Sequence, residues 1–314
     1  MHGFSILMIE ENSCRWQERK EADRMFGECH MHMFMDGVDY RKAVQLHKTQ
    51  VQEEDIRKKL KTYQEKGITF IRDGGDPYGV SGRAAQLAPE YGITYRTPGF
   101  AIHKKGHYGA VVGYAFEDWR EYAELVKRVK EEQGDFVKIM LSGIMDFGGD
   151  GSVTEEPLSK EEIREMIHIA HEEGMAVMAH VNGARTIQTA AEAGVDSVEH
   201  GNLVDEACLQ VMKESKTVWV PTYVTITNPI GKGRFEDAVM ERLRDQQGEM
   251  IRRGFELGVE IALGSDAGAY GVLHGQGVYD EYQRLQSLVG DEISDLDFRL
   301  RRAEEKIQKT FRRA

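Results

Sequence analysis

The sequence contains few cysteines, and those that it has show no pattern. Of its 314 residues only Cys14, Cys29 and Cys208 are cysteines, and no Cys-x-x-Cys pair occurs. An odd, unpatterned set argues against a disulfide framework and favours a reducing compartment. Residues 1–16 lack a basic stretch before their short apolar run and have acidic groups after it, so they make a poor signal peptide. We therefore expect a cytoplasmic protein.

Long apolar runs and basic clusters are also missing from the sequence. No uninterrupted apolar run approaches the length of a transmembrane helix. The 41 Lys and Arg residues are outnumbered by 53 Asp and Glu residues, which gives a formal net charge of −12. Nucleic acids and anionic membranes select clustered basic residues, so neither is an expected partner. We expect a small-molecule substrate as the partner, and association into a homo-oligomer stays open.

From residue 28 onward, short apolar segments alternate with longer helical ones. The strand-like segments cover residues 28–36, 68–76, 93–99, 135–143, 176–182, 197–201, 217–224 and 260–268. Helical sequence or a helical loop follows each of them, for example at 41–66 and 235–257, and Ser159 with Glu162 forms a capping-box pattern. Eight such units predict parallel strands with right-handed crossovers, which close into an α/β fold, the (β/α)₈ TIM barrel. The alternative is a doubly wound open sheet, which usually carries a glycine-rich phosphate loop that this sequence lacks.

The same pattern predicts one large domain with a short extension. Residues 1–25 precede the first strand-like segment and are expected to form an N-terminal extension. Residues 26–314 are expected to form the barrel and to end in helical sequence. The chain shows no repeat of fixed period and no obvious linker, and barrels of this length are commonly single domains.

Unusual polar residues occur near the ends of the apolar segments. They are His30 and His32 on the first segment, Lys138 on the fourth, His180 on the fifth, His200 on the sixth and Asp266 on the eighth. His30 and His32 are two positions apart, so on a strand their side chains point to the same face. Because a barrel gathers the carboxyl ends of its strands at one mouth, we expect all six side chains to meet there. Four imidazoles and a carboxylate suit one or two divalent ions such as zinc, manganese or iron.

The complete set of six residues, in this order, resembles the metal-ligand pattern of the amidohydrolase superfamily, over nearly all the chain from about residue 26. The segments DFVKIMLSG, AHVNGARTIQTAAEAGVDSVEHG and LGSDAGAYGVLHG are most similar to the imidazolonepropionase-related, prolidase-like branch. Lys138 favours the binuclear kind of site, since single-metal relatives lack a lysine on the fourth strand. Most members of this branch carry a small β-sandwich. The short stretch before the first strand and the helical sequence after Asp266 predict that the sandwich is missing here.

The resemblance implies a ligand set and a mechanism. One metal ion would be held by His30, His32 and Asp266, and the other by His180 and His200. Carbon dioxide would convert Lys138 into a carbamate, which would bridge the two ions together with a hydroxide. That hydroxide would be the nucleophile, and Asp266 would pass its proton to the leaving amine. Zinc is the expected metal, with manganese and iron as alternatives.

The implied reaction is hydrolysis of an amide bond in a dipeptide or an N-acyl amino acid. One alternative is a hydrolase of a cyclic amide, a lactone or an ester, or a deaminase. Another is a barrel that is not catalytic. The loops that follow the strands set specificity in such barrels, and here they contain no diagnostic motif.

Four further residues are candidate substrate contacts. His107, in HKKGHYG after the third strand, resembles a pocket-lining element of the branch, and its alternative is a solvated loop histidine. Tyr223 ends the seventh strand, where it could bind a substrate carboxylate or pack in the core. His274 follows the eighth strand and could touch the substrate. Arg72 ends the second strand and could bind an anion, although an ion pair with a neighbouring aspartate is the favoured alternative.

Overall fold

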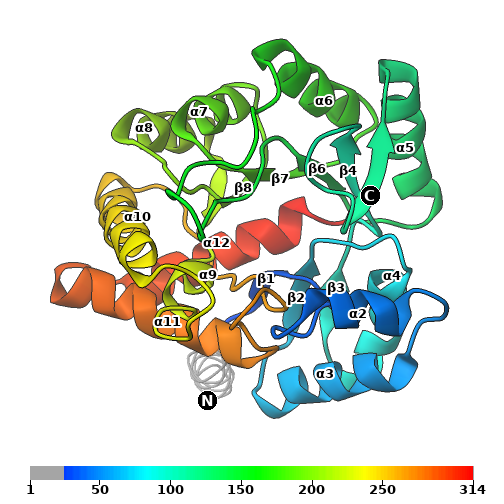
Figure 1. Ribbon diagram of the computed structural model, residues 1–314, viewed down its shortest axis with the longest axis horizontal. Coiled ribbons are helices and arrows are strands. Elements are labelled where there is room, and N and C mark those ends of the chain that lie inside the picture. Colours follow the sequence, from blue (N-terminus) through cyan, green and yellow to red (C-terminus); the bar gives the residue numbers. More distant parts are fainter. Residues whose placement is uncertain (1–24, 314) are drawn as a thin grey trace, which may run out of the picture.

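The computed structural model describes residues 25–313, so all of the predicted N-terminal extension except Met25 lies outside the described residues. The strands in this part of the chain are β1 (Glu28–Met31), β2 (Phe70–Asp73), β3 (Thr94–Arg96), β4 (Ala101–Lys104), β5 (Gly113–Phe116), β6 (Val137–Met140), β7 (Val177–Val181), β8 (Ser197–His200) and β9 (Val218–Val220). The α-helices are α2 (Tyr40–His47), α3 (Glu53–Glu65), α4 (Val80–Leu87), α5 (Trp119–Glu131), α6 (Lys160–Glu172), α7 (Ala184–Glu192), α8 (Glu206–Ser215), α9 (Val224–Thr227), α10 (Asp237–Leu257), α11 (Gln276–Val289) and α12 (Leu296–Thr310). Helices surround the strands (Figure 1).

The strands run parallel and form a closed ring. β1, β2 and β3 pair in that order, and β4 pairs with β6, which is followed by β7, β8 and β9. The extended segment 260–267 takes the eighth barrel position and is hydrogen-bonded on both sides. The Trp219 amide donates to the Glu260 carbonyl at 2.8 Å, and the Cys29 amide donates to the Leu263 carbonyl at 3.0 Å. These bonds connect β9 to β1 and complete the predicted (β/α)₈ barrel.

The third barrel strand differs from the single segment predicted at 93–99. It is divided into β3, which pairs with β2, and β4, which pairs with β6, and Pro98 lies between them. Proline has no amide hydrogen to donate to a ladder, so it favours such a break. The chain then adds β5 beside β4, a strand that is not among the eight predicted segments. The connection between β4 and β5 carries His107.

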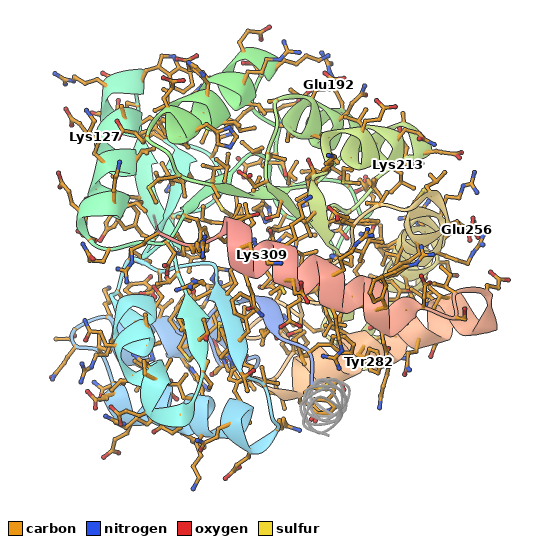
Figure 2. All side chains as sticks on the ribbon, turned by 180° about the vertical axis from the view of Figure 1, so that it is seen from behind. Lys127, Glu192, Lys213, Glu256, Tyr282 and Lys309 are labelled. Atoms are coloured by element: carbon orange, nitrogen blue, oxygen red, sulfur yellow. The ribbon has the colours of Figure 1, made fainter. Side chains whose placement is uncertain are left out.

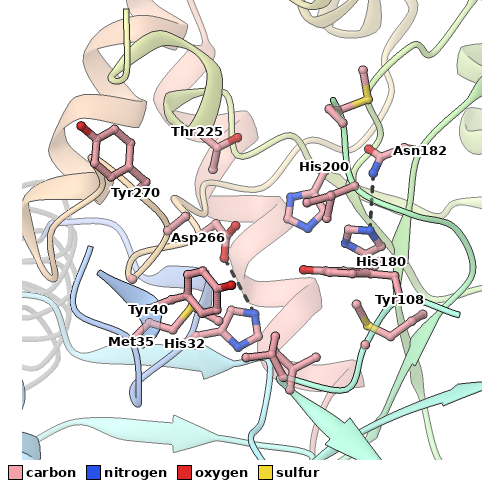
Figure 3. Close-up of a pocket in the computed structure, with 18 of the residues that line it drawn as sticks. His32, Met35, Tyr40, Tyr108, His180, Asn182, His200, Thr225, Asp266 and Tyr270 are labelled. Atoms are coloured by element: carbon pink, nitrogen blue, oxygen red, sulfur yellow. Dashed lines mark hydrogen bonds and ion pairs between the residues drawn. The ribbon is translucent and has the colours of Figure 1, made fainter. Parts of the chain in front are cut away.

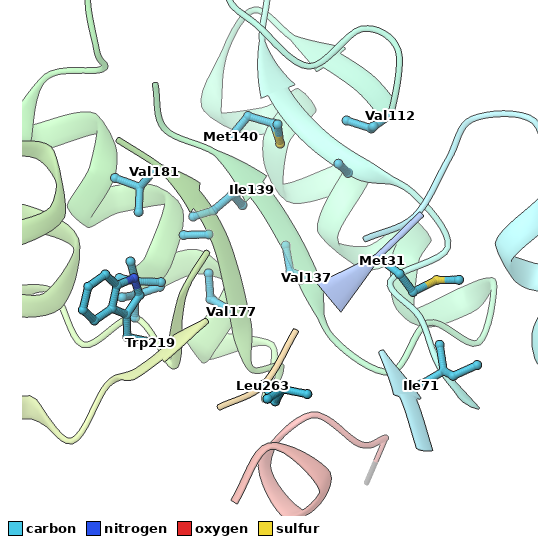
Figure 4. Packing of buried hydrophobic residues seen from close by; sticks show 14 of the residues in the cluster. Met31, Ile71, Val112, Val137, Ile139, Met140, Val177, Val181, Trp219 and Leu263 are labelled. Atoms are coloured by element: carbon cyan, nitrogen blue, oxygen red, sulfur yellow. The ribbon is translucent and has the colours of Figure 1, made fainter. Parts of the chain in front are cut away.

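Alternate residues of the strands divide between the outside and the inside of the barrel. On β6, Val137 and Ile139 belong to the large hydrophobic cluster shared with the surrounding helices (Figure 4). Lys138 and Met140 line a cavity, and Met140 also borders the same hydrophobic cluster. This is the period-two alternation of a strand, and both faces of the strand are buried, as in other parallel sheets. The alternation therefore places the amine of Lys138 inside the barrel.

The C-terminal helix α12 closes the end of the barrel at which the strands begin. Ala303 and Ile307 of α12, and Phe311 just after it, pack against residues near the starts of the strands. The ring of Phe311 stands nearly perpendicular to that of Phe136, with their centroids 5.2 Å apart. Figure 2, seen from behind, shows α12 lying across the barrel, with Lys309 labelled on it. The predicted helical C-terminus thus leaves the carboxyl ends of the strands as the open mouth.

Within residues 25–313 every strand is part of the barrel except β5, which pairs with β4 at the edge of the sheet. No separate β-sandwich is present among these residues. In this part of the chain, too, each helix is either too short or too polar to cross a membrane.

Candidate metal centre

The six predicted metal-binding residues meet at the carboxyl ends of the strands. The Nε2 atoms of His30 and His32 lie 3.6 and 3.8 Å from Oδ1 of Asp266. The ring of His200 is close to two other imidazoles, with its centroid 4.9 Å from that of His30 and 4.8 Å from that of His180. Figure 3 shows His32, His180, His200 and Asp266 around one opening.

Lys138 reaches the same opening from β6. It lines the cavity together with His32 and His180, and its Nζ atom is buried without a hydrogen-bond partner. Burial lowers the pKa of Lys138 to about 8, with smaller contributions from neighbouring charges. At neutral pH a larger share of this amine is therefore uncharged than in an exposed lysine.

Each of the four imidazoles has one ring nitrogen anchored by the protein, which leaves the other nitrogen free for a ligand. The anchoring contacts are His30 Nδ1 to Glu199 Oε2 (2.6 Å), His32 Nδ1 to the Gly75 carbonyl (3.2 Å), His180 Nε2 to the Gly143 carbonyl (3.2 Å) and His200 Nδ1 to the Thr222 hydroxyl (2.8 Å). Contacts of this kind fix the orientation and tautomer of a metal-binding histidine. Burial also lowers the pKa of all four imidazoles, to about 3 for His32 and His180, so the rings are neutral.

This donor set fits divalent metal ions. Nε2 of His30 and Nζ of Lys138 are buried without a partner, although buried polar atoms normally have one. One ring nitrogen from each of His30 and His32 and one carboxylate oxygen of Asp266 all lie within 4.8 Å of one another. Neutral imidazoles and a carboxylate are ligands that zinc and similar ions prefer. Burial raises the pKa of Asp266 to about 7, while the charge of Lys138 acts in the opposite direction.

Two of these residues have backbones in the left-handed region. The φ angle is +64° at His200 and +57° at Asp266. Residues other than glycine rarely adopt this region, and they keep it where the surrounding structure holds them. The amide of Asp266 donates to the carbonyl of His30 at 2.7 Å, which holds the two residues next to each other. Strain of this kind is concentrated at functional sites.

Glu199 connects His30 to a buried cation, the guanidinium of Arg72. Its carboxylate binds Nδ1 of His30 at 2.6 Å and the Nη2 atom of Arg72 at 2.8 Å, and all three side chains are fully buried. Arg72 also donates to the Ser197 hydroxyl (2.9 Å) and to the Cys29 carbonyl (2.7 Å). Its guanidinium is therefore fully occupied, and it does not line the cavity. This position gives no support to the predicted substrate contact and corrects the predicted ion-pair partner from an aspartate to Glu199.

A cavity of about 520 Å³ opens in front of the candidate metal-binding residues (Figure 3). Most of its lining is apolar, with Met35, Met140, Ile144 and Phe147 among the contributing side chains. The polar lining outside the metal-binding residues includes Tyr40, His107, Tyr108, Asn182, Asn202, Thr225 and Arg234. The structure thus places the predicted contact residue His107 at the cavity, with its Nδ1 atom 3.4 Å from Oε2 of Glu155.

Tyr223 and His274, the other two predicted contacts, do not line the cavity. The hydroxyl of Tyr223 donates to the carbonyl of Arg244 at 2.9 Å. The ring of His274 lies between the hydroxyl of Tyr63 (3.1 Å) and the carbonyl of Met35 (2.8 Å), so both of its nitrogens have partners. Both side chains are buried, and their hydrogen bonds hold neighbouring segments together.

Sequence reasoning missed several residues that the fold brings to this region. Tyr108 follows His107 directly, and its ring centroid lies 5.1 Å from that of His180. Glu199 precedes His200 in SVEHG, where an acidic residue within a buried strand was an available signal. Arg234 lies in the loop 228–236, and nothing in its local sequence indicates a place at the cavity.

The geometry defines a class of protein: a (β/α)₈ barrel whose strand ends gather four imidazoles, a lysine and a carboxylate at the base of one cavity. The model of the amidohydrolase family matches residues 26–284. The chain therefore belongs to the amidohydrolase family, as its ligand pattern predicted.

Two relatives illustrate the similarity in sequence. Ochratoxinase from Aspergillus niger is 27% identical over 188 residues, which cover 58% of this chain and 38% of the relative. An uncharacterised protein from Mycobacterium bovis is 30% identical over 136 residues, which cover 41% of this chain and 36% of the relative. The match thus spans well under half the length of each relative.

Solved structures show the same fold. A Xaa-Pro dipeptidase with methionine bound in its active site superposes with a TM-score of 0.72 at 22% identity, covering 91% of this chain and 75% of that chain. The Aspergillus niger ochratoxinase structure gives a TM-score of 0.69 at 21% identity, covering 91% and 70%. Phenylurea hydrolase B gives 0.62 at 13% identity, covering 91% and 73%.

Proposed function

We propose that this protein is a metal-dependent hydrolase that cleaves an amide bond in a dipeptide or an N-acyl amino acid. The proposal rests on one observation: six ligand-type side chains, five of them buried and Asp266 partly exposed, converge at a cavity, and two of their nitrogens have no protein partner. Membership of the amidohydrolase family, and a fold shared with a Xaa-Pro dipeptidase, support an amide as the substrate. A small-molecule substrate and a cytoplasmic location are parts of the same proposal.

The ligand set suits two divalent ions, with zinc as the first choice and manganese or iron as alternatives. The first ion would lie among His30, His32 and Asp266, and the second between His180 and His200. The neutral amine of Lys138 would add to the carbon of carbon dioxide and lose one proton to solvent water, which would give a carbamate with two oxygens as further metal ligands. When bound, the ions would lower the pKa of a water molecule and polarise the scissile carbonyl.

The residues of the chain orient the substrate and move the proton. The carboxylate of Asp266 accepts a proton from the attacking water and returns it to the nitrogen of the leaving amine as the C–N bond breaks. The apolar lining surrounds the rest of the substrate and keeps bulk water away from it. His107 remains our proposed contact to the substrate because it lines the cavity.

An activity screen of metal-loaded protein tests this proposal. We expect turnover of dipeptides or N-acyl amino acids, and no turnover of lactones or hydantoins. Turnover of the cyclic compounds alone would move the function to cyclic amides or esters. Protein that binds no metal and turns over nothing would favour a barrel that is not catalytic.

Replacing Asp266→Asn tests the role of the carboxylate. We expect turnover to fall by at least about a hundredfold, because proton transfer by a positioned side chain typically contributes that much. The circular dichroism spectrum should be unchanged. Asp245→Asn removes an exposed carboxylate on α10 and should keep full activity. Full activity of the Asp266→Asn protein would contradict the assigned role.

A further inference from the structure

The loop 228–236, which follows α9, brings to the cavity a cation that the proposed chemistry does not use. Arg234 lines the same cavity as Lys138 and Asp266. Among the described residues no carboxylate forms an ion pair with its guanidinium. A charged group at a cavity with no opposite charge of its own is available to a charged ligand.

Aromatic rings hold this guanidinium in place. The Cζ atom of Arg234 lies 4.2 Å from the ring centroid of Tyr270 and 5.4 Å from that of Phe235. The ring of Phe235 is in turn edge-on to those of Tyr270 and Phe147, at centroid distances of 5.9 and 5.4 Å. All three rings line the cavity (Figure 3 labels Tyr270). Arg234 is exposed, and these ring contacts restrict its side chain. A guanidinium stacked on rings loses less conformational freedom when it binds an anion than one without such contacts does.

The remaining lining shows what kind of anion would fit. Outside the metal-binding residues the cavity is apolar or carries neutral polar groups, apart from His107 and Arg234. A volume of about 520 Å³ lies in the range of pockets for small organic ligands. The chain as a whole has a formal charge of −12, so its long-range field does not favour anions. An anionic ligand therefore needs a local cation, which the guanidinium of Arg234 supplies.

We propose that Arg234 binds the carboxylate of the substrate and selects substrates that carry a free carboxylate beside an apolar or aromatic group. The planar guanidinium would bind both carboxylate oxygens, while the methionine and phenylalanine side chains of the lining would contact the apolar group. This inference rests on the proposed amide hydrolysis, because it names the substrate class for the same cavity.

A pair of probes without an amide bond tests the inference apart from catalysis. Isothermal titration of metal-loaded protein with 3-phenylpropionate and with 3-phenylpropanol compares a carboxylate with an alcohol on the same apolar group. We expect the carboxylate to bind about tenfold more tightly, the size expected for one charge-assisted contact at a partly solvated site. Arg234→Met should abolish this preference, and Arg234→Lys should keep part of it. Lys232→Met, which removes an exposed cation of the same loop outside the cavity lining, should keep all of it.

The outcomes separate this inference from the proposed function. A preference for the carboxylate that survives in Arg234→Met would place the anion elsewhere and overturn the inference, as would equal or undetectable binding of both probes to the unaltered protein. If Arg234→Met loses the preference and the unaltered protein hydrolyses no amide, the carboxylate site would be supported and the proposed amide hydrolysis would be wrong. If the protein hydrolyses amides but shows no preference for the carboxylate probe, only the inference about Arg234 would be wrong.

Discussion

Glu199 links the interior of the barrel to the position of the His30 imidazole, a proposed metal ligand. Its carboxylate is fully buried between Arg72 and His30, and the hydroxyl of Ser197 also donates to it. Burying an ion pair costs desolvation free energy, so such a pair gives little net stability. Removing one partner is different, because the remaining charge then has no compensation. The network therefore makes both the stability of the barrel and the orientation of His30 depend on Glu199.

Replacing Glu199→Gln should lower the free energy of unfolding by roughly 3–5 kcal/mol, because the charge of Arg72 then stays buried without a partner. Denaturant unfolding of the metal-free protein measures this change. Glu90→Gln breaks the exposed pair with Arg57 and should cost at most about 1 kcal/mol. Equal effects of the two substitutions would show that the buried network does not act as described.

Gly74 leaves the space that the ring of His32 occupies. A Cβ atom at position 74 would lie 2.4 Å from Cε1 and 2.8 Å from Nε2 of His32, closer than real Cβ contacts. Its φ angle is not in the left-handed region, so the backbone itself would accept a side chain. The requirement for glycine thus comes from the imidazole and not from the turn.

We expect Gly74→Ala to displace His32 and to weaken zinc binding about tenfold to a hundredfold, the range seen when the support of a metal ligand is lost. Competition with a fluorescent zinc chelator measures the affinity. Gly82→Ala lies in α4 with open space around the new methyl group, and it should leave zinc affinity unchanged. Unchanged affinity in Gly74→Ala would mean that His32 does not hold the metal in the orientation seen here.

At the scale of elements, α12 covers the end of the barrel at which the strands begin. Phe311, directly after α12, is fully buried, and the guanidinium of Arg72 lies 4.4 Å from its ring centroid. The same ring packs edge-on against Phe136 at the start of β6. The sequence predicted helical residues here but could not show that they close the barrel, because that contact depends on where the ring of strands ends.

Phe311→Ala should destabilise the protein by about 3–5 kcal/mol, the cost typical of removing a buried aromatic ring and leaving a cavity. Phe298→Ala removes the same ring from an exposed position of α12, where 66% of the residue is accessible, and should change stability by less than about 0.5 kcal/mol. Thermal unfolding of both variants gives the comparison. Similar losses of stability in both variants would contradict the role of Phe311 in closing the barrel.

At the scale of the whole molecule, local patterns predicted the order of the elements and long-range geometry decided the rest. The capping box of Ser159 and Glu162 lies at the start of α6, as its spacing predicted, because a cap depends only on neighbours in the chain. The convergence of the six candidate ligand residues could be predicted because parallel strands of one barrel end at one mouth. The pair of Arg72 and Glu199 could not, since these residues are 127 positions apart and meet only across the closed ring. The split of the third strand at Pro98 depends likewise on its two different neighbours.

The central claim is that six side chains distant in sequence bind two divalent ions at the barrel mouth. The most direct test is the metal content of protein reconstituted with zinc and bicarbonate and then freed of loose metal, measured by inductively coupled plasma mass spectrometry. We predict about two zinc ions per chain, the number expected for a binuclear hydrolase, and fewer in Lys138→Ala. Folded protein that retains no zinc after this treatment would contradict the account.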